Sequence, residues 1–299
     1  MIPSAPPQPL TVRTPAGRVF GYYDFGDPEG TPVLAMHGTP ACGAGFVWAD
    51  TVCRERGVRL LAPDRPGIGY SDRLPAGPQA TVVDHTAALL TFADALDVDS
   101  FSLLGYSGGG PYALAMAHAV PDRTRALAVV SGAGHVGEWA TLADFDTTDR
   151  QMSRLATRVP SFARIALATS ARIAKIAPRV SMWFAMTEMA AADREIVAQF
   201  PSASSALAVF TQAFLRGGAG VVDDYAALAR PWGFQVEDIT VPVHCWHATS
   251  DVNVPHRHTE DLAARIPGAG VTMWDGEGHL AIVGRVDEVL DCLLALPAQ

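Results

Sequence analysis

Short, continuously apolar runs alternate with amphipathic stretches along the first part of the chain. Residues 81–96 carry apolar side chains three to four positions apart, which is typical of a helix with one buried face. The apolar runs themselves are too short for helices, and a run that is apolar at every position is typical of a strand buried on both sides. We therefore expect a parallel sheet covered by helices, with strands near 18–25, 33–36, 59–62, 101–104 and 126–130, and helices near 45–56, 81–96 and 111–119.

This alternation stops in the middle of the chain and resumes near its end. From about residue 134 to residue 230 only helical patterns occur, rich in Ala, Met and Phe. We therefore predict an α/β fold with a mostly parallel central sheet, helices on both faces and an inserted all-helical cap. The later strands are expected at 241–246 and 271–274 and the later helices at 258–266 and 286–296, so that residues 1–134 and 231–299 form the core and residues 135–230 the cap.

Composition and charge exclude several classes of protein. The chain has 299 residues and a net charge of −9, whereas nucleic-acid-binding proteins present a basic surface. No apolar run reaches the ~18 residues of a membrane-spanning helix, and residues 1–10 lack the apolar core of a signal peptide. The scattered cysteines indicate free thiols, so we expect a cytoplasmic protein without a metal or cofactor; they are Cys42, Cys53, Cys245 and Cys292.

The segment Gly105-Tyr106-Ser107-Gly108-Gly109 matches the pattern G-x-S-x-G. It follows the apolar run 101–104 and opens a helical stretch, which is the strand–turn–helix setting of a nucleophile elbow. The turn is so tight that a β-carbon at Gly105 or Gly109 would meet neighbouring backbone. We therefore predict that Ser107 is a nucleophile.

A serine hydroxyl becomes a nucleophile only when a base takes its proton and an acid orients that base. The chain supplies Asp251 in the loop after one late strand and His279 in the loop after the last strand. Ser107, Asp251 and His279 all lie where strands end, the edge at which open α/β sheets place their sites. Glu138 and Asp144 follow an earlier strand and are the alternative candidates for the acid.

With these residues the chain resembles the α/β-hydrolase fold superfamily, from about residue 20 to residue 294. The resemblance implies a catalytic triad of Ser107, Asp251 and His279. It also implies that the loop His37-Gly38-Thr39 and the elbow form an oxyanion hole from the backbone N–H groups of Thr39 and Gly108. The turn at residues 64–71 is interpreted as scaffold around the pocket.

The implied activity is that of a serine hydrolase acting on a carboxylic ester, a lactone or a thioester through an acyl-enzyme. Epoxide hydrolases and haloalkane dehalogenases of this fold are disfavoured because they have Asp where this chain has Ser107. Carbon–carbon bond hydrolases share the triad and remain an alternative, and a ligand-binding receptor of the same fold is a second one. The expected partner is a small molecule with an apolar acyl or alcohol part; the pattern specifies neither the substrate-contacting residues nor an oligomeric state.

Several other residues are weaker candidates for a site. On a strand, His244 and His247 would point to opposite faces, so they could not share a metal ion. His256 and His258 begin a polar helix and are expected to be solvated, whereas His135 is a candidate to face substrate. A set of Met and aromatic residues in the cap could line an apolar pocket or pack between helices: Met182, Trp183, Phe184, Met186, Phe210 and Phe214.

Charge is distributed unevenly within the predicted cap. Residues 150–180 contain seven basic residues and no acidic one, which leaves the rest of the protein at −9 − 7 = −16. Solvated helix faces would explain this stretch. A lid that attracts an anionic substrate or an acidic partner is the alternative, and an interfacial amphipathic helix is also compatible with the pattern.

Overall fold

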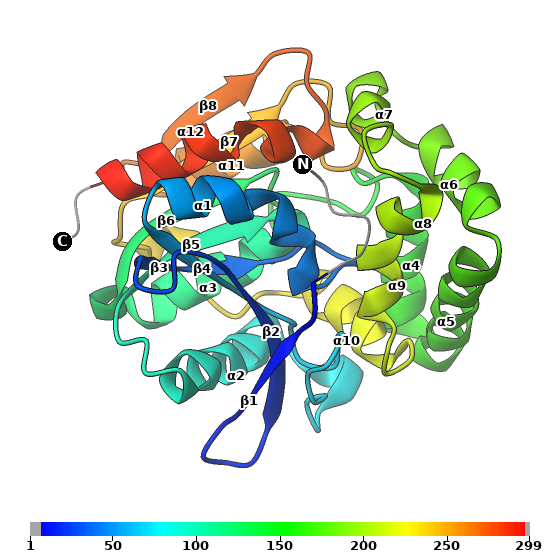
Figure 1. The fold of residues 1–299 in the computed structure, drawn as a ribbon, viewed down its shortest axis with the longest axis horizontal. Coiled ribbons are helices and arrows are strands. Elements are labelled where there is room, and N and C mark those ends of the chain that lie inside the picture. Colours follow the sequence, from blue (N-terminus) through cyan, green and yellow to red (C-terminus); the bar gives the residue numbers. More distant parts are fainter. Residues whose placement is uncertain (1–6, 297–299) are drawn as a thin grey trace.

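The computed structural model describes residues 7–296, and within them the fold is built on one eight-stranded sheet (Figure 1). The strand order is β1-β2-β4-β3-β5-β6-β7-β8. β1 and β2 run antiparallel to their neighbours, and all other pairs are parallel. The strands are β1 (Leu10–Arg13), β2 (Val19–Gly26), β3 (Thr31–Met36), β4 (Val58–Pro63), β5 (Phe101–Tyr106), β6 (Thr124–Val130), β7 (Val243–Ala248) and β8 (Gly270–Trp274).

Each central strand contributes to two separate cores, one on either side of the sheet. In β3, Val33 and Ala35 pack on one face, and Leu34 and Met36 pack on the other. This alternation explains the continuous apolar run, because successive side chains of a strand point in opposite directions and both faces are covered. The predicted fold class, a mostly parallel sheet between helices, is therefore confirmed.

Helices from both halves of the chain cover the two faces. One core includes side chains of α1 (Asp50–Glu55) and α12 (Ile282–Ala295), and the other includes those of α2 (Val82–Ala95), α3 (Gly110–Ala119) and α11 (Arg257–Arg265). A Thr81–Asp84 capping box begins α2, since each side chain bonds the backbone N–H of the other residue. The strand β1 was not predicted, because its four residues form a largely exposed edge pair and carry no continuous apolar run.

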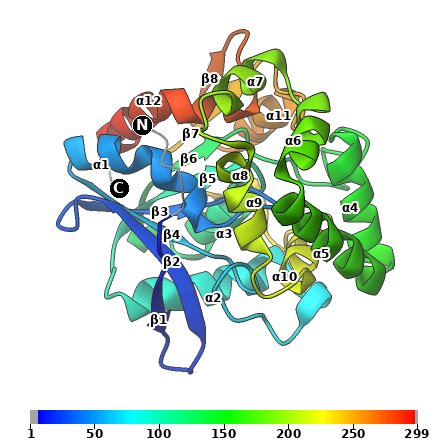
Figure 2. The ribbon, with the colours of Figure 1, turned by 45° about the vertical axis from the view of Figure 1, so that its right-hand side comes forward.

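Only helices and loops occupy the chain between β6 and β7. We call α4 to α10 the insertion helices. Pro160 and Pro178 stand at the first positions of α5 and α6, where a missing N–H costs no hydrogen bond. Figures 1 and 2 show α4 to α9 gathered on one side of the molecule. The insertion helices are α4 (Thr147–Arg158), α5 (Pro160–Ile176), α6 (Pro178–Thr187), α7 (Ala191–Val197), α8 (Ala203–Ala206), α9 (Ala208–Ala213) and α10 (Ala219–Leu228).

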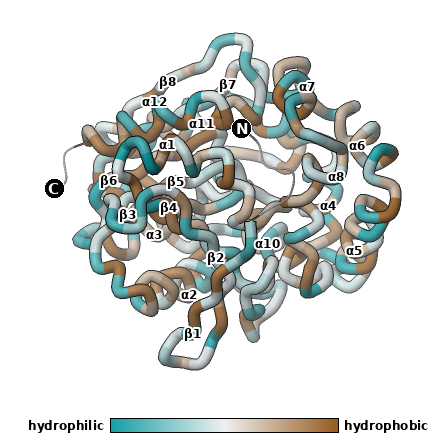
Figure 3. The backbone as a smooth tube through the Cα atoms, viewed as in Figure 1, coloured by the Kyte–Doolittle hydropathy of each residue, from teal (hydrophilic) through white to brown (hydrophobic). Residues whose placement is uncertain are grey.

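The tube view shows apolar residues concentrated along the central strands and in the helices packed on them (Figure 3). Between residues 7 and 296, no helix combines the length and hydropathy that crossing a bilayer requires. The four cysteines are free thiols, three of them buried and Cys292 partly exposed.

Candidate active site

Ser107 lies at the tight turn between β5 and α3. Its φ of 53° is in the left-handed region, where few residues other than glycine are found. The flanking glycines are required, because a β-carbon at Gly105 would lie 2.8 Å from the Cα atom of Gly110 and one at Gly109 would overlap the carbonyl of Met36. The turn therefore holds the serine hydroxyl at the carboxyl end of the sheet in a strained conformation.

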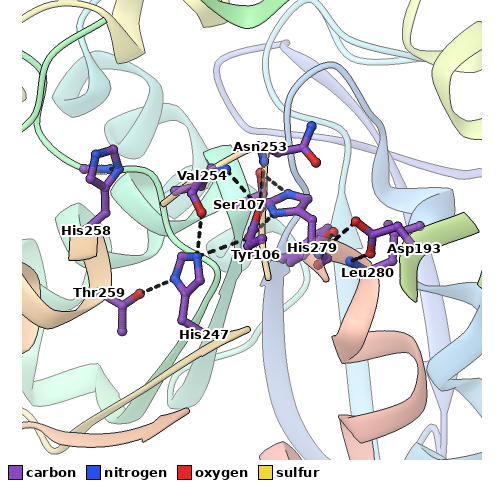
Figure 4. A network of polar contacts seen from close by, with 12 residues as sticks. Tyr106, Ser107, Asp193, His247, Asn253, Val254, His258, Thr259, His279 and Leu280 are labelled. Carbon is purple, nitrogen blue, oxygen red and sulfur yellow. Dashed lines mark hydrogen bonds and ion pairs between the residues drawn. The ribbon is translucent and has the colours of Figure 1, made fainter. Parts of the chain in front are cut away.

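The structure joins Ser107, His279 and Asp251 through two successive hydrogen bonds. Figure 4 labels Ser107 and His279. His279 Nε2 lies 2.9 Å from Ser107 Oγ, and His279 Nδ1 lies 2.6 Å from Asp251 Oδ2. A carboxylate only accepts hydrogen bonds, so Nδ1–H donates to Asp251 and leaves Nε2 free to accept the serine proton. This arrangement can activate a hydroxyl for attack on a carbonyl.

Asp251 is anchored by the loop that follows β7. Its Oδ1 accepts the backbone N–H groups of Asn253 at 2.9 Å and Val254 at 3.0 Å, and its Oδ2 also lies 3.1 Å from His247 Nε2. Burial opposes ionisation of the Asp251 carboxyl. The charge of His279, and the hydrogen bonds from His247 and His279, nevertheless hold the pKa of Asp251 well below the ordinary value. Asp251 is therefore a carboxylate that fixes the orientation of the His279 ring.

The other acid candidates are engaged elsewhere. Glu138 lies 3.0 Å from His135, and Asp144 contacts Arg257 and His258. The expectation of a solvated His258 was wrong: its side chain is buried, and its Nδ1 accepts the backbone N–H of Gly134 at 3.2 Å. A side chain on the first turn of an amphipathic helix can face the core, which the polar local sequence concealed.

Burial alone would lower the pKa of His279, but its neighbours reverse that effect. Asp251 raises the pKa most strongly, and the charges of Asp193 and Asp149 act in the same direction. The net result is a pKa above the ordinary value for histidine. Asp193 and Asp149 both come from the insertion helices, so these helices contribute to the electrostatics of the site.

Asp193, in α7, forms a contact that the sequence did not indicate. Its carboxylate is 1% exposed and accepts the backbone N–H groups of His279 at 3.0 Å and Leu280 at 2.8 Å (Figure 4). A β-carbon at Gly278 would overlap this carboxylate, so the approach requires a glycine. One insertion helix therefore holds the backbone of the loop that carries His279.

Thr39 and Gly108 lie side by side beside Ser107. A β-carbon on Gly108 would come within 3.0 Å of the Cβ atom of Thr39, and all three residues line one pocket. Within residues 7–296, the Thr39 amide donates to no protein acceptor. The two residues predicted to form the oxyanion hole are thus neighbours in space and lie beside the serine.

A buried ion pair fixes the loop that carries Thr39. Arg65 donates to Asp224 of α10 at 2.6 and 2.8 Å, and both side chains are fully buried. The same guanidinium donates to the carbonyl of Gly38 at 3.1 Å and to Thr39 Oγ1 at 2.8 Å, and it also contacts the carbonyl of His37. The turn at residues 64–71 is thus scaffold as expected, but its partner Asp224 carried no sequence signal.

The pocket at Ser107 is mainly apolar. Besides Ser107 and its hydrogen-bond partner His279, the polar side chains at the pocket are those of Thr39, of Asp149 and Ser153 in α4 and of Tyr225 in α10, and no Arg or Lys of the described chain lines it. Tyr225 donates to Asp149 Oδ1 at 2.6 Å. The apolar lining consists of Pro111, Ala133, Val136, Leu142, Phe145, Leu228, Ala229 and Val254.

The aromatic residues proposed for the pocket lie elsewhere. Trp183 and Phe184 are exposed, and Phe214 packs in the core beside α5. His135 is buried against Trp232, with ring centroids 4.6 Å apart, so it does not face this pocket. The lining instead comes from short segments around residues 133–153 and 225–229, which show no aromatic stripe; Met182, Met186 and Phe210 are also absent from it.

The described residues include no group of three or more side chains suited to a metal ion. His244 contacts Thr272 Oγ1 at 2.9 Å, and His247 contacts Thr259 Oγ1 at 2.7 Å. The two imidazoles thus have separate partners, in agreement with the prediction that they point to opposite faces of β7.

The family model of the alpha/beta hydrolase fold matches residues 31–285, and the chain belongs to that family. Among curated relatives, 2-hydroxymuconate semialdehyde hydrolase from Pseudomonas putida is 38% identical over 109 residues, which is 36% of this chain and 38% of that protein. Haloalkane dehalogenase 2 from Mycobacterium bovis is 34% identical over 113 residues, 37% of either chain. The match thus spans less than half of each relative.

Similarity in structure extends further than similarity in sequence. The crystal structure of bromoperoxidase from Bacillus anthracis superimposes with a TM-score of 0.71, covering 96% of this chain and 99% of that one. The sequence identity in this superposition is 20%. At that level the comparison establishes the shared fold and carries no information about substrate.

Proposed function

We propose that this protein is a serine hydrolase that cleaves a carboxylic ester, or a related lactone or thioester, through an acyl-enzyme. The observation that carries this proposal is the pair of hydrogen bonds that link Ser107 Oγ to His279 and His279 to Asp251. We also propose that residues 135–230 act as a cap over the pocket, since α4 and α10 contribute to its lining. A reducing cytoplasm fits the free thiols.

In the proposed mechanism, Ser107 Oγ forms a bond to the carbonyl carbon while its proton passes to His279 Nε2. The electrons of the carbonyl double bond move to the oxygen, whose negative charge is stabilised by the N–H groups of Thr39 and Gly108. When the tetrahedral intermediate collapses, the bond to the leaving oxygen breaks and His279 gives that oxygen the proton. Water then attacks the acyl-enzyme by the same sequence, releasing the acid and restoring Ser107.

The chemistry of the pocket favours a neutral substrate over an anionic one. Apolar side chains surround Ser107, and the ionisable side chain among the lining residues, Asp149, is a carboxyl group whose pKa is raised to about 7 by burial. A muconate, as in the name of the Pseudomonas putida relative, carries a carboxylate, and no Arg or Lys of the described chain lines the pocket to pair with it. We therefore place the ester hydrolase first, and the carbon–carbon bond hydrolase, suggested by that relative, second.

Covalent labelling with a fluorophosphonate tests the nucleophile. We expect wild-type protein to be labelled at Ser107, and Ser107→Ala to lose both labelling and at least about 10⁴-fold in kcat with an unchanged melting temperature. Ser102→Ala, in β5, the strand that precedes the turn, is the matched control. This variant should still be labelled at Ser107. Full turnover in Ser107→Ala would contradict the assignment.

A substrate panel separates the two activities. It consists of p-nitrophenyl esters of increasing acyl length, a lactone, and a dienoate diketone that is cleaved at a carbon–carbon bond. We expect ester turnover to exceed diketone turnover, with the preferred chain length set by the apolar lining. Cleavage of the diketone alone would select the second activity, and labelling without any turnover would indicate a ligand-binding receptor.

A further inference from the structure

The helix α5 exposes an apolar stripe on the side opposite to its packed face. Small residues and Leu167 bury one face of α5, at positions 163, 167, 171 and 174. Phe162, Ile165, Ile173 and Ile176 lie about half a turn away, at helical spacing, and are 60%, 62%, 48% and 81% exposed. A surface helix ordinarily presents polar residues on that side, so this stripe is unpartnered rather than part of the core.

The exposed apolar surface continues into α6. A single residue, Ala177, separates α5 from α6. Ile176 is the last residue of α5, and Val180 lies in the first turn of α6. Trp183 and Phe184 follow one turn later and are 64% and 62% exposed. The helices α5 and α6 lie at the right-hand edge in Figure 1, away from the central sheet. We call these seven exposed side chains the outer apolar surface.

The segment that carries this surface is also rich in cations. Residues 150–187 contain seven basic side chains and no acidic one. Within residues 7–296, no ion pair involves the exposed cations of this stretch, although most other arginines of the protein pair with carboxylates. These unpaired cations are Arg154, Arg158, Arg164, Arg172, Lys175 and Arg179.

A second pocket lies against α5, although none of the seven side chains of the outer apolar surface lines it. Arg172 and Lys175 of α5 line it together with Phe214, Gly217 and two alanines of α5. Two cations over an apolar floor match the chemistry of a lipid phosphate with its first acyl carbons. The pocket is separate from the one at Ser107, since the two share no lining residue.

We propose that the outer apolar surface and its cations bind the surface of a bilayer that contains anionic phospholipid. Side chains of Trp, Phe and Ile interleaved with Arg and Lys are the composition of interfacial helices, whose apolar side enters the headgroup region while the cations contact lipid phosphates. The rest of the protein has a net charge of −16 (−9 − 7), so repulsion would turn it away from an anionic bilayer and direct α5 and α6 toward the lipid.

A second copy of the chain fits the same surface less well. A two-fold symmetric contact would place the α5 cations of one copy against the α5 cations of the other, because such an interface uses the same patch twice. With no acidic residue between 150 and 187, like charges would meet across that contact. Charge complementarity therefore selects the anionic bilayer.

Vesicle flotation of the full chain tests the proposal. The probes are vesicles of phosphatidylcholine alone and of phosphatidylcholine mixed with phosphatidylglycerol, at low and high salt. We expect binding to the mixed vesicles only, weakened by salt. Arg172→Gln with Lys175→Gln, and separately Ile176→Ser with Trp183→Ser, should each lower the partition coefficient by roughly tenfold or more.

The matched controls replace the same number of cations or apolar side chains at exposed positions outside the insertion helices. Arg13→Gln with Arg125→Gln removes two exposed cations, and Val83→Ser with Val271→Ser removes two apolar side chains that are each 42% exposed. Both controls should bind vesicles as the wild type does. Equal binding to both vesicle types, no binding, or test variants that bind like the wild type would overturn the proposal. So would a dimer, seen by analytical ultracentrifugation, that Ile176→Ser with Trp183→Ser disrupts while no vesicle binding occurs.

Discussion

At the scale of single residues, the candidate site is defined by carboxyl groups around one imidazole. Asp251, Asp193 and Asp149 all favour the charged form of His279, and together they outweigh the burial that opposes it. Asp251 holds the ring and Asp193 holds the backbone of the same residue. His279 is thus held from two sides, as its proposed role as the base requires.

Asp193→Asn should change the pH dependence of catalysis. A base with a raised pKa stays protonated, and inactive, to higher pH, so activity rises as the pH passes through that pKa. Removing the Asp193 charge lowers the pKa of His279, and the acidic limb of kcat/KM should move to lower pH while kcat falls because the loop is held less firmly. The pH–rate profile measures both effects; a fall in kcat with an unmoved limb would assign Asp193 a purely structural role.

Asp149→Asn should stabilise the protein at high pH. Burial, with help from Asp146, raises the pKa of Asp149 to about 7, although the Tyr225 hydroxyl opposes the shift. Since the folded state keeps this proton while the unfolded state loses it near pH 4, the contribution of Asp149 to the free energy of unfolding falls as pH rises from about 4 to 7. Asparagine accepts the same Tyr225 bond without ionising.

The free energy of unfolding, from urea titrations at pH 5 and pH 8, measures this effect. We expect the Asp149→Asn gain to be larger at pH 8 than at pH 5 by about 1 kcal/mol, a value reduced because the group faces the pocket. Asp122→Asn, at an exposed position, is the control. An equal gain at both pH values would show that Asp149 titrates in the same way in the folded and unfolded states.

Sequence patterns identified the residues whose role is tied to a strand end. Ser107, Asp251 and His279 each follow a recognisable strand, and their side chains meet because parallel strands end at one edge. Asp193 and Asp224 lie in helices without any motif, and their partners are 86 and 159 residues distant. Such contacts depend on how helices pack, which local sequence does not encode.

At the scale of elements, α10 and the loop after β3 form one unit through Arg65 and Asp224. Both side chains are fully buried, so the charge of each is compensated by the opposite charge of the other. Asp224 also accepts a hydrogen bond from the hydroxyl of Tyr112 at 2.7 Å. The pKa of Asp224 lies below its ordinary value, because Arg65 outweighs the opposing effect of burial. The pair therefore fixes the loop, although burying the two charges has an unfavourable desolvation energy.

Replacing one partner of this ion pair should destabilise the protein more than replacing both partners. Asp224→Leu leaves an uncompensated buried guanidinium and should destabilise the protein by about 3–5 kcal/mol, whereas Arg65→Met with Asp224→Leu should recover most of that loss. The double variant still lacks the bonds to Gly38 and Thr39, so its kcat should remain about 10²-fold low. Urea unfolding and ester kinetics separate the two effects; full activity in the double variant would exclude a role for the pair in catalysis.

Elements with a strong pattern were predicted closely, and those held by packing were not. The apolar runs at 33–36 and 101–104 fall inside β3 and β5, because a strand buried on both faces has little freedom in composition. In contrast, α8 and α9 have only four and six residues, too few for a periodic pattern to mark their ends. The edge strand β1 was missed for the same reason, since its four residues are stabilised by pairing with β2.

At the scale of the whole molecule, charge and apolar surface are segregated. The basic residues of α4 to α6 and the exposed side chains of α5 and α6 occupy the insertion helices, and the sheet with its covering helices carries the acidic excess. None of the seven basic residues lines the pocket at Ser107, so they are not placed to bind an anionic substrate there. This segregation gives the protein a distinct face, which the mean composition conceals.

The two insertion-helix carboxylates act on opposite members of the site: Asp193 on the loop of the base, Asp224 through Arg65 on the loop beside the elbow. An outward movement of α7 and α10 would release both loops together. The proposed proton acceptor and the proposed oxyanion donors would then lose their positions together. In the proposed hydrolase, activity therefore depends on α7 and α10 remaining packed against these two loops.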